Sequence, residues 1–333
     1  MVRVAVDALG GDRAPDEIVA GAAEAASAEV QPILYGPAGI ETNGLPLVET
    51  IGAIDMDDHP VESVRAKPDS SLVRAVRAVA EGDADTVVSA GSTGAMLAAS
   101  LLHIRRLPGV FRPAIGVVLP GRQGPTVLID AGANADARPE HLVQFGHMGA
   151  EFAHDILGVE DPVVRLLSIG EEDEKGNQLT LEANELLRES ALRFAGNTES
   201  RWLLDGDSDV VVTDGFTGNV ALKALEGTIR TILESLRTEL ESSFRGRLGG
   251  LLIRPAARGI RKRLDPDTYG GAYLLGLRGL VVIAHGSSSR IAIANAIRLA
   301  ARGVDHDVVP RLEARLSSLG APRQEASAGS PSS

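Results

Sequence analysis

The chain contains no cysteine among its 333 residues. Disulfide bonds, thiolate metal sites and a cysteine acyl-enzyme are therefore excluded. Lysine is also scarce, with four residues beside 29 arginines. The chain enters a strand-like pattern at residues 2–6 without a charged leader and a long apolar run. Neither a secretory signal nor a membrane-spanning helix is expected, and the cytoplasm is the expected location.

The formal net charge of −12 argues against a general nucleic-acid-binding protein, because such a protein presents a basic face. The charge is unevenly spread, however. The segment 242–264 has no acidic residue and seven basic ones, which are Arg245, Arg247, Arg254, Arg258, Arg261, Lys262 and Arg263. This basic segment indicates an acidic protein partner or an anionic membrane surface.

Short apolar runs alternate with helical patterns, and this alternation predicts an α/β protein with a largely parallel, doubly wound sheet. Strands are expected at 2–6, 32–35, 86–89, 114–119, 127–130, 163–168, 210–213 and 280–284. Helices are expected at 70–81, 93–104, 139–157, 179–194 and 288–301. A hydrophobic content of 44% allows one large domain over 1–319, and the small polar residues of 320–333 predict a disordered tail.

A projecting helical arm is expected over about 225–264. Apolar residues keep helical spacing from Leu225, and Gly249, Gly250 and Pro255 are expected to break this helix and begin a second one. The arm has two interpretations, which are a solvated hairpin that packs on a dimer mate and a docking surface.

The segment VVVTDGFTGNVALK, at 210–223, combines a buried strand, a polar turn and a helix start. Asp214, Thr217, Gly218 and Asn219 supply turn and capping chemistry, so free N–H groups at this helix start are expected to converge on an anion. Lys223 follows one turn later and adds a cation. The pattern predicts a phosphate site.

Similar polar loops follow other predicted strands, and we expect five such loops to share one crevice at the carboxyl ends of the sheet. Their candidate residues are Asp7, Gly10, Gly11, Asp12, Ser89, Gly91, Ser92, Thr93, Asn134, His285, Gly286 and Ser287. None of the loops has a GxGxxG or Walker A pattern, so a small anion fits better than a dinucleotide. His141 and His147 lie roughly 120° apart on one helix and are treated as structural.

The chain resembles the PlsX family of bacterial phosphate acyltransferases over almost everything before the tail. The matching segments are AVDALGGDRAP, KPDSSL, SAGSTGAMLA, DAGANADARPEHLVQF, IGEEDEKGNQLTLEA, VTDGFTGNVALK and YGGAYLLGLRGLVVIAHGSSS. The chain departs from the family pattern at Ser92, Trp202 and Tyr273.

The resemblance implies transfer of a long-chain acyl group from acyl carrier protein to inorganic phosphate, with direct attack of phosphate on the thioester. It also implies a homodimer, a Rossmann-like α/β/α fold similar to phosphotransacetylases and isopropylmalate-type dehydrogenases, and delivery of acyl phosphate to a membrane glycerol-3-phosphate acyltransferase. No cofactor or metal ion is expected. Lys223, Asn219 and His285 are the expected catalytic residues, with His285 or Asn219 as donor to the thioester oxygen.

Three alternatives remain open at this point. The first is a short-chain phosphotransacylase that uses acyl-coenzyme A, and the second is a non-catalytic scaffold for carrier protein or membrane. The third is a dehydrogenase, which the absence of a dinucleotide fingerprint disfavours.

Overall fold

A computed structural model describes the backbone of residues 1–264 and 270–319 and the side chains of residues 1–259 and 270–317. The expected tail at 320–333 lies outside the described residues. The strands are β1 (Val2–Asp7), β2 (Val30–Gly36), β3 (Leu47–Glu49), β4 (Thr86–Ser89), β5 (Ala114–Leu119), β6 (Thr126–Ile129), β7 (Val163–Ser168), β8 (Arg193–Glu199), β9 (Val210–Val212), β10 (Ala272–Leu275) and β11 (Leu280–Ile283). The helices are α1 (Asp16–Ala25), α2 (Pro60–Ala66), α3 (Ser71–Glu81), α4 (Thr93–His103), α5 (Pro139–Leu157), α6 (Gln178–Glu189), α7 (Gly215–Glu241), α8 (Phe244–Leu264), α9 (Arg290–Asp305) and α10 (Val308–Leu319), with a short 3₁₀ turn at Ser200–Trp202.

One sheet runs through the whole molecule, in the order β3-β2-β1-β4-β11-β10-β5-β6-β9-β7-β8. Most neighbouring strands are parallel, as expected. The pairs β11/β10, β10/β5 and β5/β6 are antiparallel. Because the direction reverses three times, the block β6-β9-β7-β8 runs opposite to the block β3-β2-β1-β4-β11. The carboxyl ends of the strands in one block therefore lie at the opposite end of the sheet from those in the other block.

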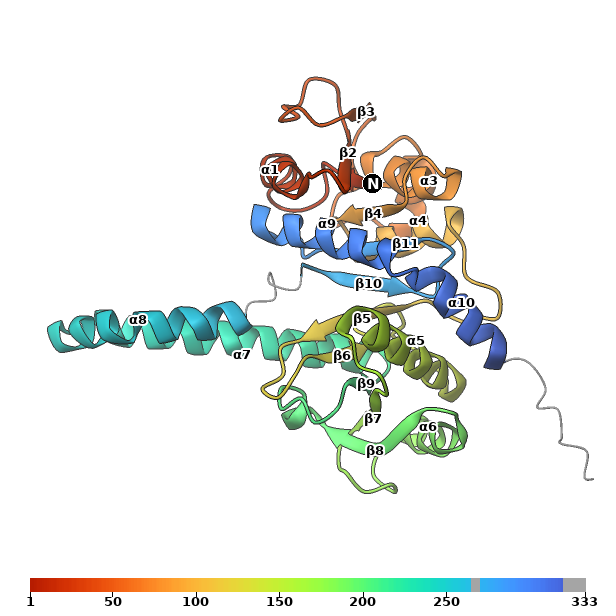
Figure 1. Cartoon of the computed structure of the whole chain (residues 1–333), viewed down its shortest axis with the longest axis vertical. Helices are drawn as coiled ribbons and strands as arrows, with labels where there is room; N and C mark the ends of the chain where they lie inside the picture. Colours follow the sequence, from red (N-terminus) through yellow and green to blue (C-terminus); the bar gives the residue numbers. More distant parts are fainter. Residues whose placement is uncertain (265–269, 320–333) are drawn as a thin grey trace, which may run out of the picture.

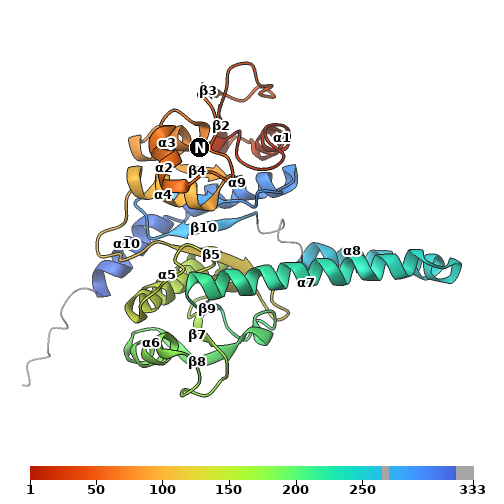
Figure 2. The ribbon, with the colours of Figure 1, turned by 180° about the vertical axis from the view of Figure 1, so that it is seen from behind.

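Helices cover both faces of the sheet. In Figure 1, α1, α5, α6, α9 and α10 lie on the near face, and Figure 2 shows α2, α3, α4 and α7 on the other. The strand pattern explains the two layers, because successive side chains point to opposite faces. Val4 and Val6 of β1 belong to the core under α1 and α9, whereas Ala5 between them belongs to the core under α3. The doubly wound architecture is confirmed.

Three expected element boundaries are wrong, and one of them is the end of α9, which falls at Asp305 and not at residue 301. The helix expected over 179–194 ends at Glu189, and Arg193–Glu199 forms the edge strand β8 beside β7. At the arm, the first helix continues to Glu241 and the break falls at residues 242–243. Gly249, Gly250 and Pro255 lie inside α8 instead of breaking the helix.

The two arm helices pack side by side and project away from the sheet (Figures 1 and 2). The first three turns of α7 lie on the sheet, where Leu222 packs against the core under α3 and α4. Further along α7, Ile232 and Leu236 are exposed. Within the described part of the chain, no helix combines the length and the apolar character that crossing a membrane requires.

Candidate active site

The loops after β1, β4 and β11 meet at one end of the sheet. The Asp12 N–H donates to the Gly286 carbonyl at 2.8 Å. A Cβ atom at Gly10 would lie 2.5 Å from Asp7 Oδ2 and 2.8 Å from Ser89 Oγ, which leaves room only for glycine. Three of the five loops expected to share a crevice are therefore in contact.

Asp7 and Ser89 are buried polar residues that hold these loops in place. The Ser89 hydroxyl donates to Asp7 Oδ2 at 2.7 Å, and the Gly91 N–H donates to Ser89 Oγ at 3.0 Å. Burial raises the pKa of Asp7, although the hydrogen bonds that it accepts counteract this. Asp7 and Ser89 thus hold the backbone of the loops and do not face solvent.

The start of α4 lies among the same loops. Ser92, which the sequence proposed as a ligand contact, caps this helix by accepting the Ala95 N–H at 3.4 Å. Thr93 is exposed and Gly94 is half-buried. Among the described residues, the N–H groups of Thr93 and Gly94 have no acceptor. Free N–H groups at a helix start attract anions, so α4 offers a binding position for one.

The loops after β6 and β9 form a separate group at the opposite end of the strands. Asp130 is fully buried and accepts five hydrogen bonds. Its Oδ1 accepts the N–H groups of Ile115, Gly132 and Ala133 at 2.9, 3.1 and 3.0 Å. Its Oδ2 accepts the backbone N–H and the side-chain amide of Asn134 at 2.7 and 2.8 Å. Burial raises the pKa of Asp130, and these donors oppose that effect.

The start of α7 packs directly on this Asp130 loop. A Cβ atom at Gly218 would fall 2.0 Å from the Asp130 carbonyl oxygen. The Gly215 N–H donates to the Asn134 carbonyl at 2.8 Å, and the Thr217 N–H donates to the Asp214 carboxylate at 2.9 Å. The expectation of free N–H groups at this helix start is therefore wrong for Gly215 and Thr217.

Helix α7 joins the two groups of loops. Lys223 Nζ lies 3.2 Å from His285 Nε2, across 62 residues of sequence. His285 Nδ1 lies 2.9 Å from Ser287 Oγ, and Glu226 accepts from Lys223 Nζ at 2.9 Å. Asn219 is exposed one turn before Lys223, so both residues lie on one side of the helix.

The five loops fall into two groups that begin at opposite ends of the strands, and α7 connects them, because Gly132 packs against the Asn219 side chain one turn before Lys223. The physical reason is the three strand reversals at β10, β5 and β6, which the sequence pattern did not reveal. Sequence reasoning also missed Glu226. The spacing of Glu226 three residues after Lys223 on a helix was a usable signal, because such pairs are neighbours.

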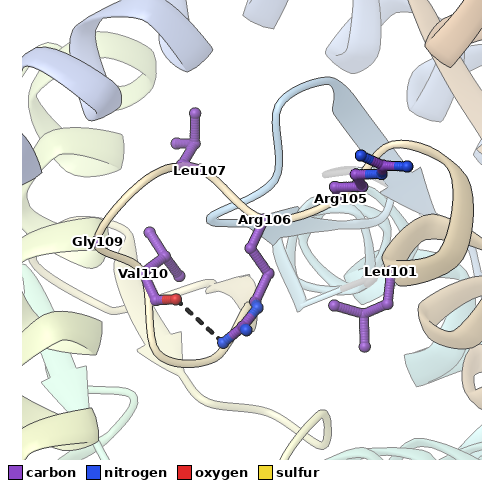
Figure 3. Close-up of a pocket in the computed structure, with 6 residues that line it drawn as sticks. All are labelled: Leu101, Arg105, Arg106, Leu107, Gly109 and Val110. Atoms are coloured by element: carbon purple, nitrogen blue, oxygen red, sulfur yellow. Dashed lines mark hydrogen bonds between the residues drawn. The ribbon is translucent and has the colours of Figure 1, made fainter.

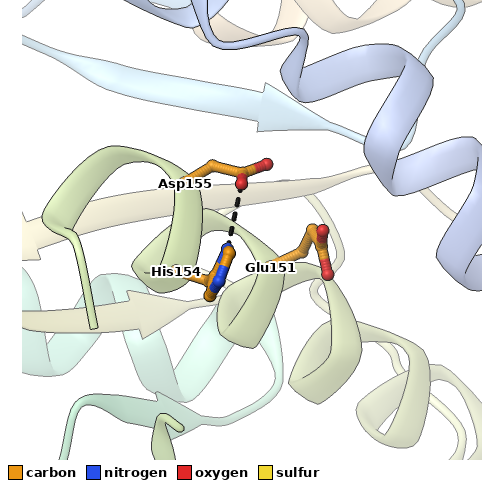
Figure 4. A group of neighbouring side chains, drawn as sticks. All are labelled: Glu151, His154 and Asp155. Carbon is orange, nitrogen blue, oxygen red and sulfur yellow. Dashed lines mark hydrogen bonds and ion pairs between the residues drawn. The ribbon is translucent and has the colours of Figure 1, made fainter. Parts of the chain in front are cut away.

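A second cluster of titratable side chains lies on α5, far from the Lys223 pair in the sequence. Ligand atoms of Glu151, His154 and Asp155 lie within 4.8 Å of one another (Figure 4). The buried Asp155 carboxylate, however, already pairs with His154 at 3.0 Å and with Arg311 of α10 at 2.8 Å. A guanidinium at this distance repels a cation. The cluster therefore fastens α10 to α5.

The two histidines treated as structural both lie on α5. His141 Nδ1 accepts the Arg138 N–H at 3.2 Å and so closes the start of the helix. His147 is buried, and its desolvation lowers its pKa to about 4. Neutral His147 is consistent with a position inside the core.

The chain is similar to known proteins over most of its length. A family model described as "Fatty acid synthesis protein" matches residues 2–311. A phosphate acyltransferase from Heliobacterium modesticaldum is 45% identical over 324 residues, which cover 94% of this chain and 97% of the relative. A phosphate acyltransferase from Thermosynechococcus vestitus is 47% identical over 325 residues, which cover 94% of each chain.

Among solved structures, the EutD phosphotransacetylase from Staphylococcus aureus is similar with a TM-score of 0.59 and 18% identity, over 91% of this chain and 94% of that one. This likeness confirms the phosphotransacetylase-like fold. The two phosphate acyltransferases are 45% and 47% identical to this chain over 94% of its length, and this similarity shows the family as well as the fold. The chain belongs to the phosphate acyltransferase (PlsX) family, and it is an acyltransferase.

Proposed function

We propose that the protein transfers a long-chain acyl group from acyl carrier protein to inorganic phosphate and releases acyl phosphate. The relatives are phosphate acyltransferases by name, and the pairing of Lys223 with His285 carries the assignment of the site. A cation and an imidazole lie together on an exposed surface, at the end of the sheet where α4 begins. Such a group suits an anionic nucleophile.

The chemistry follows from the charge of phosphate. Phosphate is already anionic at neutral pH, so a phosphate oxygen attacks the thioester carbon directly and the carbon–sulfur bond breaks. The thiolate then leaves and takes up a proton. Lys223 and the free N–H groups of Thr93 and Gly94 hold phosphate, and His285 or Asn219 donates to the carbonyl oxygen as negative charge develops. The absence of cysteine agrees with a single displacement.

Of the other candidate residues, Thr217 is exposed, whereas Gly218 and Asp214 shape the start of α7. The Ser287 N–H donates to His285 Nδ1 at 3.3 Å, and Gly11 lies close against the Gly286 carbonyl, where a Cβ atom would fall 2.9 Å from the oxygen. We infer that these residues position the reacting groups.

A direct assay tests the reaction. Purified protein is incubated with phosphate and a palmitoyl carrier-protein thioester, and acyl phosphate is trapped with hydroxylamine as the hydroxamate. We expect hydroxamate that depends on both phosphate and protein, and much less from acetyl-coenzyme A. Preference for acetyl-coenzyme A would establish the short-chain alternative, and no hydroxamate from either thioester would leave the proposal without support.

The arm is the second part of the proposal, as a docking surface for acyl carrier protein or for the anionic inner face of the cell membrane. On α8, Phe244, Leu248, Leu251 and Leu252 are exposed and form one apolar stripe at helical spacing. Arg245, Arg247, Arg254 and Arg258 are exposed beside this stripe. The side chains of Arg261, Lys262 and Arg263 lie outside the described residues. Acidic carrier protein and anionic lipid both complement such a surface.

Charge reversal on the arm distinguishes the two partners. We expect the triple variant Arg247→Glu, Arg254→Glu and Arg258→Glu to lose most of its binding either to anionic liposomes in flotation or to carrier protein in titration calorimetry, because both depend on positive charge.

The matched control is the triple variant Arg65→Glu, Arg122→Glu and Arg193→Glu. It makes the same change in net charge at exposed positions away from the arm. Equal binding by both variants would reject docking through the arm and leave the dimer-contact interpretation. Sedimentation of the arm variant then tests whether the arm joins two copies.

These assignments imply where in the cell the protein acts. We infer a cytoplasmic homodimer that reaches the membrane surface peripherally and passes acyl phosphate to a membrane glycerol-3-phosphate acyltransferase. The support is the exposed apolar and basic face of α8.

A further inference from the structure

Helix α7 presents an apolar face beside the candidate active site. Phe216 and Val220 are 65% and 54% exposed, although both side chains are apolar. Asn219, Val220 and Lys223 follow Phe216 by three, four and seven residues, so all four side chains lie on one side of the helix. The apolar face thus continues directly into the pair of Lys223 and His285.

Apart from Lys223, this face carries no charge from α7 up to the third turn. The first acidic residue of the helix is Glu226, and its carboxylate accepts from Lys223 Nζ at 2.9 Å. Asp214, directly before the helix, is buried and accepts the Thr217 N–H at 2.9 Å. A ligand that extends from Lys223 toward the start of α7 therefore meets the methyl groups of Val220 and the ring of Phe216.

On the other side of the pair the surface is acidic. A Cβ atom at Gly286 would fall 2.9 Å from Met56 Cε and 3.6 Å from Asp12 Oδ2, so both side chains lie against Gly286. The turn that carries Met56 has three carboxylates, which belong to Asp55, Asp57 and Asp58. Lys67 neutralises Asp58 at 2.6 Å, whereas Asp55 and Asp57 are exposed. Covering carboxylates with hydrocarbon is costly, so this direction disfavours an acyl chain.

A cavity of about 410 Å³ at the far end of α4 is the alternative place for an acyl chain. Figure 3 shows its lining residues, which are Leu101, Arg105, Arg106, Leu107, Gly109 and Val110. The guanidinium groups of Arg105 and Arg106 point away from each other, so charge borders the cavity on two sides (Figure 3). Helix α4 has 11 residues, so its two ends are roughly 16 Å apart at 1.5 Å per residue. The charge and the distance from the reacting pair both favour α7 over this cavity.

We propose that Phe216 and Val220 contact the acyl chain of the thioester substrate and select long chains. The inference rests on the proposed function, because it takes the pair of Lys223 and His285 as the reacting site. Phe216 lies seven residues before Lys223, about 10 Å along the helix axis, so a short acyl group does not reach it. Each further methylene group that meets this face leaves water, so stabilisation of the transition state grows with chain length.

Chain-length preference tests the inference. Hydroxamate formation is measured with butyryl and palmitoyl carrier-protein thioesters at fixed phosphate, for the unchanged protein and for the double variant Phe216→Ser and Val220→Ser. We expect the ratio of kcat/KM for palmitoyl over butyryl to fall about tenfold or more in the variant, as for the lost burial of a large apolar side chain. The butyryl value and the melting temperature are expected to stay nearly unchanged, because both side chains are exposed.

The matched control is the double variant Leu101→Ser and Leu102→Ser. It removes two apolar side chains, 37% and 47% exposed, at the far end of α4 beside the cavity. We expect it to keep the ratio of the unchanged protein. A fall in the ratio for this variant alone would place the chain in the cavity and overturn the inference, as would an unchanged ratio in the α7 variant.

A contact between two copies of the chain is the remaining use of this face. It would be established, and the inference overturned, if the α7 variant lost activity equally with both thioesters and sedimented as a smaller species. Sedimentation at the size of the unchanged protein, with the selective loss for palmitoyl, supports the inference.

Binding of thioethers that do not react separates this inference from the proposed function. The probes are S-hexadecyl and S-butyl phosphopantetheine, titrated calorimetrically. We expect the unchanged protein to bind the hexadecyl probe more tightly and the α7 variant to lose most of that difference. Absence of hydroxamate from the unchanged protein would remove the proposed function, whereas equal affinities of that protein for the two probes would overturn the assignment of Phe216 and Val220.

Discussion

Replacement of Lys223 by alanine is expected to lower kcat/KM for phosphate about 100-fold, the usual cost of removing one donor that stabilises charge at a reacting centre. Lys223 Nζ is the cation beside His285, at 3.2 Å, and its side chain is 51% exposed. An exposed lysine contributes little to folding, so the melting temperature is expected to stay near that of the unchanged protein. Steady-state kinetics with varied phosphate and a fixed acyl thioester provide the measurement.

Lys175→Ala is the matched control, because it removes another of the four lysines from a region outside the candidate site. We expect Lys175→Ala to keep full activity. Lys223→Arg, which preserves charge but changes its geometry, is expected to lie between the two. If Lys223→Ala showed unchanged kcat and phosphate KM, Lys223 would have no part in the site and phosphate would have to bind elsewhere.

The largest effect on stability is expected at Asp130. Asp130→Asn keeps an oxygen for the three N–H groups that Oδ1 accepts but places an amide against the two donors of Asn134. Two buried donors left unsatisfied cost about 3 kcal/mol in the free energy of unfolding. Asp130→Ala removes all five acceptor contacts and is expected to cost more. Denaturant unfolding followed by circular dichroism measures the difference.

Asp136→Asn tests whether the effect belongs to the buried carboxylate, since Asp136 is exposed in the same connection. We expect little change in its unfolding free energy. The Asp130 loop carries the start of α7, so Asp130→Asn is also expected to lower kcat in the folded fraction by shifting Lys223. Unchanged stability in Asp130→Asn would show that Asp130 is not the anchor of this loop.

Much of the secondary structure was predictable because it rests on local patterns. The eight expected strands are all present, with boundaries that differ by two residues or fewer, and α5 begins and ends where expected. The three strands that were missed have particular reasons. β3 and β10 are three and four residues long, and β10 follows Gly270 and Gly271, which read as a loop. The residues of β8 continue the helical sequence pattern of α6, and they form a strand because they pair with β7 at the edge of the sheet.

The site was predictable in its parts and less so in its assembly. Lys223, Asn219 and His285 were recognised from their loops, and Lys223 does meet His285. At the start of α7, which the sequence predicts as the anion site, the Gly215 and Thr217 N–H groups instead donate to the Asn134 carbonyl and the Asp214 carboxylate. The start of α4, where Thr93 and Gly94 keep free N–H groups, was indistinguishable from α7 in sequence. Only the packing of neighbouring loops decides which N–H groups remain free.

By itself, the sequence determined the α/β class, the strand-end loops, the basic arm and the family, because these depend on residue types and on spacing along the chain. Tertiary structure decided the direction of each strand, and with it which loops share an end of the sheet. Strand direction depends on pairing between residues distant in sequence, which no local pattern encodes. For the same reason, the contact between Lys223 and His285 became visible only in the folded chain.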